Sequence, residues 1–337
     1  MTMDVLPLIW MLFLAASIVL YVLLDGISLG IGILFPFARS DQERAVMMST
    51  VSPVWDGNQT WLVSGGAALF AAFPKAFNLL LSALYLPLMA MLIALVFRGV
   101  AFEFHARAKD KRLWNLAFVG GSTVAGFCQG LVLGTYVLGF RYDGTKLVMG
   151  PLDFLSPFSI MTGLGVLLAY ALSGSCWLIF KTEGELRERA RRRARVLLPA
   201  VVGMILVVCV WTPAVVTEIR ERWFGWPNLI MLSPIPIWIA VVALATYAVL
   251  RQPKLRNDAL PMLCTLGLYL LTLLGLLVSL WPFVVPRVLT FWQAAAPESS
   301  LLFTLVGVLL IVPVIFVYTA HAYYVFRGKV GAEDAYH

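Results

Sequence analysis

The sequence predicts an all-α, polytopic membrane protein. Of its 337 residues, 61% are hydrophobic and only 13% are charged, whereas about a quarter of the residues in soluble domains carry charge. Its uncharged apolar runs are about as long as the roughly 20 helical residues that cross a bilayer core. We therefore expect a single membrane domain over residues 1–337, because no polar segment is long enough to form a separate soluble domain.

Nine apolar runs are long enough to be transmembrane helices, with boundaries good to about three residues. A polar stretch, Arg39–Thr50, follows the first run and is predicted to form a short helix at the membrane surface. The predicted spans are Val5–Phe35, Val51–Phe73, Phe77–Phe97, Leu113–Phe140, Phe158–Phe180, Val196–Val216, Leu229–Leu250, Leu260–Trp281 and Leu301–Phe326.

The basic residues predict the orientation of these spans. Of the 25 Lys and Arg residues, 19 lie in connections that follow odd-numbered spans and six lie on the other side. Because Lys and Arg accumulate in cytoplasmic loops, the N-terminus is predicted to be periplasmic and the C-terminus cytoplasmic. The net charge of +7 then reflects orientation, and no nucleic-acid partner is expected. The most basic connection, Lys181–Arg195, is predicted to be a solvated helix near anionic lipid headgroups.

One polar block interrupts the apolar pattern, Trp55-Asp56-Gly57-Asn58-Gln59-Thr60-Trp61. An Asp at the centre of a membrane helix costs about 2.5–3.5 kcal/mol, so such a residue calls for an explanation. A second acid, Asp25, shares a helix face with Ser28 in the first span, and the Gly26/Gly30 pair allows a neighbouring helix to approach closely. The predicted topology places both acids in the cytoplasmic half of the bilayer.

Two explanations for these acids stay open. Buried carboxyl groups exchange protons when burial raises their pKa, so Asp25 and Asp56 are candidate members of a proton path that starts in the cytoplasm. Alternatively, they cap helix ends or pair with interfacial Arg residues. Asp56 follows Pro53, so it also suits the first turn of a helix, where the helix dipole favours an acid.

Histidine and cysteine placement argues against a redox centre in this chain. The three histidines are His105, His321 and His337, and only His321 falls within a predicted span. This inventory does not provide a buried bis-His haem site. The four cysteines form no Cys-x-x-Cys pair, and no nucleotide-binding motif is present. We expect neither a metal site nor a ligated cofactor.

Five blocks of residues carry a family resemblance. They are Asp25-Gly26-x-x-x-Gly30-x-Gly32, Pro53-x-Trp55-Asp56-Gly57-Asn58-Gln59-x-Trp61-Leu62, Gly65–Pro74, Phe97–Phe104 and Trp281-Pro282-Phe283-Val284-x-Pro286. Together they resemble subunit II of cytochrome bd-type quinol oxidases, over the whole chain. A further motif, Trp292-x-Ala294-Ala295-Ala296-Pro297, resembles the cyanide-insensitive branch of that family, which the short chain also fits.

The resemblance implies a respiratory complex in the bacterial inner membrane that oxidises quinol and reduces dioxygen to water. Subunit I of that family holds two b-type haems, one d-type haem and the quinol site, and small single-span accessory subunits can join. Subunit II ligates no haem, stabilises subunit I and contributes a cytoplasmic proton path. A proton-coupled secondary transporter is the alternative from another class, and a scaffold without a proton role is a third possibility.

The resemblance also assigns residues. Asp56 matches the family acid of the proton path, Asp25 matches the acid that ends the first span, and Ser28 stands where some members have a second acid. The expected path consists of Asp25, Ser28, Asp56, Asn58, Gln59 and Thr60. The residues expected to pack near the partner subunit or its haems are Trp55, Trp61, Gly26 and Gly30.

Overall fold

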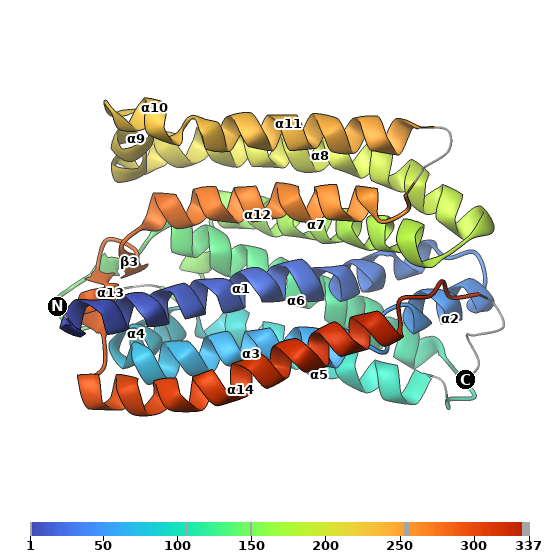
Figure 1. Cartoon of the computed structure of the whole chain (residues 1–337), viewed down its shortest axis with the longest axis horizontal. Helices are drawn as coiled ribbons and strands as arrows, with labels where there is room; N and C mark the ends of the chain where they lie inside the picture. Colours follow the sequence, from blue (N-terminus) through green and yellow to red (C-terminus); the bar gives the residue numbers. More distant parts are fainter. Residues whose placement is uncertain (1, 106, 149, 253–256, 332–337) are drawn as a thin grey trace.

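The computed structural model of the chain describes residues 2–105, 107–148, 150–252 and 257–331. Its long helices lie side by side and run back and forth along one axis, with the start of α1 and the end of α14 at opposite ends of the bundle (Figure 1). Within the described residues, the helices of 18 residues or more are α1 (Thr2–Leu34), α3 (Trp55–Ala72), α5 (Tyr85–His105), α6 (Arg112–Leu138), α7 (Pro157–Lys181), α8 (Gly184–Val215), α11 (Pro234–Arg251), α12 (Leu260–Leu280) and α14 (Glu298–Val325).

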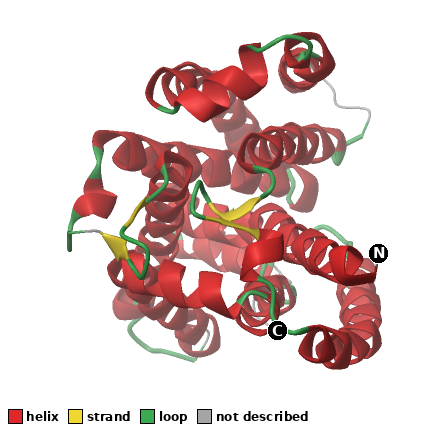
Figure 2. Ribbon diagram, turned by 90° about the vertical axis from the view of Figure 1, so that its left-hand side faces the viewer, coloured by secondary structure: helices red, strands yellow, loops and turns green. Residues whose placement is uncertain are grey.

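Short elements close the two ends of the bundle. The end that carries α2 (Asp41–Ser49), the first turns of α8 and residues 326–331 is called the basic end below (Figure 1). The opposite end holds two antiparallel hairpins, which appear as the yellow strands in Figure 2. Its elements are α4 (Pro74–Ala83), β1 (Arg141–Tyr142), β2 (Leu147–Val148), α9 (Thr217–Phe224), α10 (Asn228–Leu232), β3 (Phe283–Val285), β4 (Leu289–Thr290) and α13 (Phe291–Ala294). Two single 3₁₀ turns, Phe35–Phe37 and Asp153–Leu155, complete the described elements.

Eight helices of the described chain are long and apolar enough to cross a membrane, so the predicted all-α membrane class is confirmed. Helix α3 covers the predicted span Val51–Phe73 and crosses the bundle beside α1. It falls outside the eight because its first two turns carry Asp56, Asn58 and Gln59. The count of nine spans and the orientation of the termini stay predictions.

The predicted third span, Phe77–Phe97, is wrong in its position. The chain forms the short helix α4 and then starts a new helix at Tyr85, which continues to His105. Pro87 explains this start, because proline lacks an N–H group and is tolerated in a first turn, where the N–H groups have no intrahelical acceptor. Arg98 was predicted to begin a cytoplasmic connection, but it lies inside α5 with none of its side chain exposed.

Polar segments at the basic end differ in how well the sequence predicted them. The surface helix within Arg39–Thr50 is confirmed as α2, whose N-cap Ser40 accepts a hydrogen bond from the Glu43 N–H at 3.2 Å. In the connection Lys181–Arg195, α7 ends at Lys181 and α8 begins at Gly184, so the predicted helix forms from Gly184 onward but is not simply solvated. Arg189 is buried and pairs with Glu43 of α2. The predicted basic residues Lys254 and Arg256 lie outside the described residues, as does His337.

The core of the bundle is built around α7. In its most apolar window, 61% of the residues are buried, compared with 17% for α8, 11% for α11 and 6% for α14. Helices α1 and α6 pack against α7, and α5 packs against α6; each of these three helices buries about two fifths of its most apolar window. Helices α8, α11 and α14 therefore form the outside of the bundle, where large apolar side chains face lipid or a protein partner.

Close approach of α6 to α5 depends on Gly121. A Cβ atom at Gly121 would lie 2.5 Å from the Ala94 carbonyl oxygen and 2.9 Å from the Arg98 nitrogen. Both atoms belong to the α5 backbone, which cannot rotate away as a side chain would. At the adjacent Gly120, nothing lies within 4 Å of the corresponding position.

The two neighbouring glycines give a matched test of this packing. We expect Gly121→Ala to lower the unfolding temperature of the purified protein, because the added methyl overpacks the α5–α6 contact at a cost of about 1–3 kcal/mol. Gly120→Ala should leave the unfolding temperature unchanged or slightly raised, since Ala favours helix by about 1 kcal/mol over Gly. Equal unfolding temperatures for the two variants would contradict the close contact.

Candidate functional site

The most deeply buried charges in the described chain are an ion pair between α5 and α1. Arg98 donates from Nη1 to Asp25 Oδ1 at 2.9 Å and from Nη2 to Asp25 Oδ2 at 3.0 Å. Neither side chain has any exposed surface. The two parallel hydrogen bonds form the fork-to-carboxylate geometry that gives the strongest protein ion pairs. Asp25 therefore has both oxygens committed to one guanidinium group.

Helix α3 supplies two amides to this ion pair and its surroundings. Gln59 accepts a hydrogen bond from Arg98 Nη2 at 3.1 Å. Asn58 is fully buried and donates to the Leu24 carbonyl oxygen of α1 at 3.1 Å. Tyr323 of α14 in turn donates its hydroxyl hydrogen to Asn58 Oδ1 at 3.1 Å. The predicted residues Asp25, Asn58 and Gln59 are thus brought together, with Arg98 and Tyr323 as additional members.

A second polar cluster lies one turn from Asp25, on the same face of α1. Gln129 of α6 donates to the Tyr21 hydroxyl at 2.7 Å and accepts from the Tyr170 hydroxyl at 2.6 Å. Tyr21, Gln129 and Tyr170 belong to α1, α6 and α7, so this cluster ties the three central helices together. Ser28 is fully buried one turn from Asp25, and its hydroxyl has no hydrogen-bond partner among the described residues.

Asp56 occupies an environment opposite to that of Asp25. Its side chain is exposed on the outer face of α3, and no described side chain pairs with it. Thr60, one turn further along, is half-buried and donates its hydroxyl hydrogen to the Asp56 carbonyl oxygen at 3.1 Å. The structure therefore does not join the two predicted acids directly, because Asn58 and Gln59 point inward where Asp56 points outward.

Of the four residues predicted to pack near a partner, Gly26, Gly30 and Trp61 are buried within this chain and Trp55 is half-buried. The Tyr170 ring covers Gly26, and the α7 backbone lies so close to Gly30 that a Cβ there would be 1.9 Å from the Tyr170 carbonyl oxygen. Trp61 is 2% exposed and packs on Phe316 of α14. Trp55 stacks on Phe102 of α5, with ring centroids 5.0 Å apart. These residues thus take part in helix–helix packing within the subunit, and their place near a partner subunit or its haems stays a prediction.

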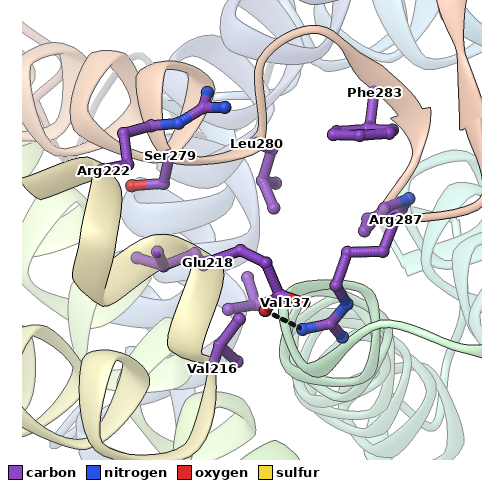
Figure 3. Close-up of a pocket in the computed structure, with 10 residues that line it drawn as sticks. Val137, Val216, Glu218, Arg222, Ser279, Leu280, Phe283 and Arg287 are labelled. Carbon is purple, nitrogen blue, oxygen red and sulfur yellow. Dashed lines mark ion pairs between the residues drawn. The ribbon is translucent and has the colours of Figure 1, made fainter.

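Two cavities flank the ends of the bundle. At the basic end, a cavity of about 230 Å³ is lined by Thr50, Trp177, Lys181 and Tyr323, among others. At the opposite end, a cavity of about 30 Å³ lies between α9 and the loop after α12 (Figure 3). An ion pair between Glu218 and Arg287, at 3.6 Å, crosses it. The smaller cavity has room for about one water molecule, so it is too small for an organic substrate.

Comparisons with known proteins decide the family. The family model for cytochrome bd terminal oxidase subunit II matches residues 6–326. This chain belongs to that family. It is 28% identical to the cytochrome bd-I ubiquinol oxidase subunit 2 of Escherichia coli strain K12, over 98% of this chain and 97% of that protein. It is 27% identical to the cytochrome bd ubiquinol oxidase subunit 2 of Bacillus subtilis strain 168, over 97% of each.

A solved structure agrees with the family in its fold. The chain is similar to a chain of the bd oxidase from Geobacillus thermodenitrificans, with a TM-score of 0.78, 18% sequence identity and coverage of 93% of this chain and 97% of that one. The predicted resemblance is thereby confirmed. The protein is a multi-pass membrane subunit of a quinol oxidase, an oxidoreductase complex.

The described residues of this subunit II do not fit a haem held by their own ligands. Buried His105 is hydrogen-bonded to Asn115 Oδ1 at 2.9 Å and packs against the edge of Phe35. His321 is exposed on α14. No cluster of three or more His, Cys, Asp and Glu side chains occurs in the described chain. We therefore derive no step at a haem from the residues of this subunit.

Sequence reasoning missed Arg98 and Tyr323 as members of the site. Arg98 was assigned to a loop because it ends an apolar run, yet the residues after it, Gly99-Val100-Ala101-Phe102, are again apolar. That continued apolar pattern was the signal that Arg98 lies within a helix. Tyr323 gave no comparable signal, because tyrosines near the end of a span are common at membrane interfaces.

The ion pair predicts a difference between single and double substitution. Arg98→Leu leaves the Asp25 carboxylate buried and unpaired, which costs about 3–5 kcal/mol, so we expect loss of folded complex or a strongly lowered unfolding temperature. The double variant Asp25→Leu/Arg98→Leu should be more stable than Arg98→Leu, because it removes both charges.

A surface ion pair provides the control for this comparison. Arg39 lies 3.6 Å from Glu185, and both side chains are mostly exposed. Arg39→Leu should therefore change stability by at most about 1 kcal/mol. If Arg98→Leu matched Arg39→Leu in thermal unfolding of the purified complex, the buried pair would not hold α1 to α5 as described.

Proposed function

We propose that this subunit II stabilises a haem-bearing subunit I and supplies part of a proton path from the cytoplasm toward it. Two b-type haems and one d-type haem in subunit I would carry electrons from quinol to dioxygen. The complex would lie in the bacterial inner membrane, with lipid around it and with room for small single-span accessory subunits. Sensitivity to cyanide stays a prediction from the motif that includes Trp292.

The observation that carries the proposal is the exposed carboxylate of Asp56 in the first turn of α3, which pairs with no side chain among the described residues. Asn58 bonds to the carbonyl of Leu24, which lies ten residues before the end of α1. At 1.5 Å per residue, that level is about 15 Å inside the helix end. Asp56 lies two residues nearer the basic end, about 3 Å closer to it. In the predicted topology this level lies in the cytoplasmic half of the bilayer, where lipid solvates a carboxylate poorly, so we expect a protein surface to cover Asp56.

The residues around Asp56 suit an interface with another membrane protein. Along α3, Val63 and Phe70 are 68% and 61% exposed, and along α5, Val96 and Phe97 are 64% and 58% exposed. The Trp55–Phe102 stack holds the two helices together at the level of Asp56. An apolar face with one unpaired acid is complementary to a partner that offers a donor or water at the same level. We assign this face to subunit I.

The two acids take different roles in the proposed path. Asp25 is fixed by Arg98, so the pair provides a neutral, ordered centre that orients Gln59. Asp56 has no such partner and is the acid that exchanges protons with the subunit interface. Ser28 and Thr60 contribute hydroxyl groups, which can accept and donate a proton at once. Asn58 and Gln59 orient the groups between the two acids.

The alternative of a proton-coupled secondary transporter is not favoured. Membership of the oxidase family and the match over nearly the whole chain account for the same buried polar residues. Transport would require an alternating-access site between two repeated halves. The sequence shows no convincing internal repeat at the residue level.

Purification of the tagged chain from native membranes tests the proposal directly. We expect a larger partner subunit by mass spectrometry and b- and d-type haem bands in the reduced-minus-oxidised visible spectrum. The purified complex should consume dioxygen with a quinol as donor. A colourless chain that purifies without a partner would contradict the proposed function.

Replacement of Asp56 tests its role in proton transfer. We expect Asp56→Asn or Asp56→Ala to lower quinol-dependent oxygen consumption about tenfold or more, because the path loses its exchanging acid. Asp56→Ala can in addition reduce haem retention, if the acid also holds subunit I. Glu221→Gln is the matched control, since Glu221 is an exposed acid of α9 at the opposite end. Normal turnover with full haem content in Asp56→Ala would remove this assignment.

A further inference from the structure

The larger cavity opens where three segments of the basic end meet. Ser49 and Thr50 line it from the end of α2, Trp177 and Lys181 from the last turns of α7, and Tyr323 from α14. Its volume of about 230 Å³ compares with roughly 30 Å³ for one water molecule in the liquid, so several waters fit. Its lining combines apolar side chains, such as Val54 and Phe326, with the hydroxyl groups of Ser49, Thr50 and Tyr323 and the ammonium group of Lys181, which can bind water.

The residues after α14 hold the mouth of this cavity in place. Lys181 donates to the carbonyl oxygens of Phe326 and Gly328, the latter at 2.8 Å. The Val330 N–H donates back to the Lys181 carbonyl oxygen at 2.8 Å. Lys329 at the rim donates to Asp258 at 2.7 Å, and this hydrogen bond raises the pKa of Lys329 in spite of its partial burial. The mouth is therefore a fixed opening with charged groups already paired or bound.

Tyr323, on the inner wall of the cavity, also belongs to the buried hydrogen-bond network around the Arg98–Asp25 pair. The Tyr323 ring packs edge-on against Trp177, with centroids 6.0 Å apart, and its hydroxyl donates to Asn58. Asn58 reaches the carbonyl of Leu24, the residue before Asp25. The Tyr323 and Asn58 side chains thus link the cavity to the level of the Arg98–Asp25 pair.

Three residues within one turn of α3, Asp56, Asn58 and Gln59, extend this link around the helix. Successive residues of an α-helix are about 100° apart, so Asn58, Gln59 and Asp56 point toward three different neighbours in turn. Asn58 faces α1 and α14, Gln59 faces Arg98 of α5, and Asp56 faces the exposed side of α3. The polar groups therefore lead from the cavity, around α3, to the proposed interface.

We propose that the cavity lined by Ser49, Lys181 and Tyr323 is the entrance of the proton path, and that Tyr323 is the positioning residue that joins it to the buried network. This inference rests on the proposed function. A proton from water in the cavity passes along hydroxyl groups and waters, each of which accepts one proton and gives up another. The net result is one proton moved from solvent to the Asp56 carboxylate, with no group oxidised or reduced.

Blocking the cavity from its wall tests the proposal. Ser49→Cys places a thiol on the cavity wall, whereas Ser52→Cys places one three residues away on exposed surface that does not line it. Each purified complex is assayed for quinol-dependent oxygen consumption before and after reaction with a charged methanethiosulfonate reagent. We expect turnover of Ser49→Cys to fall about fivefold on labelling, equivalent to about 1 kcal/mol of activation free energy. Labelled Ser52→Cys and reagent-treated wild type should keep their rates.

A second variant tests Tyr323 without adding bulk. Tyr323→Phe retains the ring against Trp177 and removes only the hydroxyl hydrogen bond to Asn58. Tyr324→Phe is the matched control, because Tyr324 is an exposed neighbour whose ring lies under Arg327. We expect Tyr323→Phe to keep its haem content but to show a larger solvent isotope effect and a steeper loss of turnover with rising pH. A purely structural role for Tyr323 would change neither of those two readouts.

The outcomes separate this inference from the proposed function. If the wild-type complex has no haem-bearing partner and no quinol oxidase activity, the proposed function itself fails. If the wild-type complex is active but labelled Ser49→Cys keeps full turnover, with labelling verified by mass spectrometry, the entrance is elsewhere. A pH profile and isotope effect of Tyr323→Phe identical to wild type would overturn the role of Tyr323.

Discussion

The buried ion pair between Arg98 and Asp25 is the interaction around which the rest of the structure is arranged. Two charges without any exposed surface have to be matched in geometry, because an unpaired buried charge costs several kcal/mol. The match requires α1 and α5 to lie at one distance and one register. Glycines meet that requirement: Gly30 allows α7 to close over α1, and Gly121 allows α6 to close over α5.

The two acids that the sequence singled out show how tertiary environment separates identical side chains. Asp25 lies in the centre of the bundle and is saturated by one guanidinium group. Asp56, at nearly the same level, lies on the surface of the subunit with no side-chain partner. One acid therefore stabilises the fold of this subunit, whereas the other is left for a neighbour. This division supports a subunit that completes its site only in a complex.

Helix geometry explains why one contiguous polar block in α3 contacts several different helices. Because residues advance about 100° around the axis, four neighbours in sequence contact nearly every side of the helix. Asn58 joins α3 to α1 and α14, Gln59 joins it to α5, and Asp56 faces outward. A change of one residue in the register of α3 would turn each of these side chains toward the wrong neighbouring helix. The block therefore specifies how α3 sits among three helices, beyond any proton-carrying role.

The sequence by itself determined the membrane class, the family, the surface helix α2 and most of the long helices. Those features depend on local hydrophobicity, capping and motifs that lie close together in the chain. Tertiary structure alone decided that Arg98 lies within α5 and pairs with Asp25, 73 residues away. It also decided that Asp56 is exposed and that Trp61, Gly26 and Gly30 pack internally. These outcomes depend on how helices that are far apart in the sequence pack against one another, and a local sequence pattern carries no information about that packing.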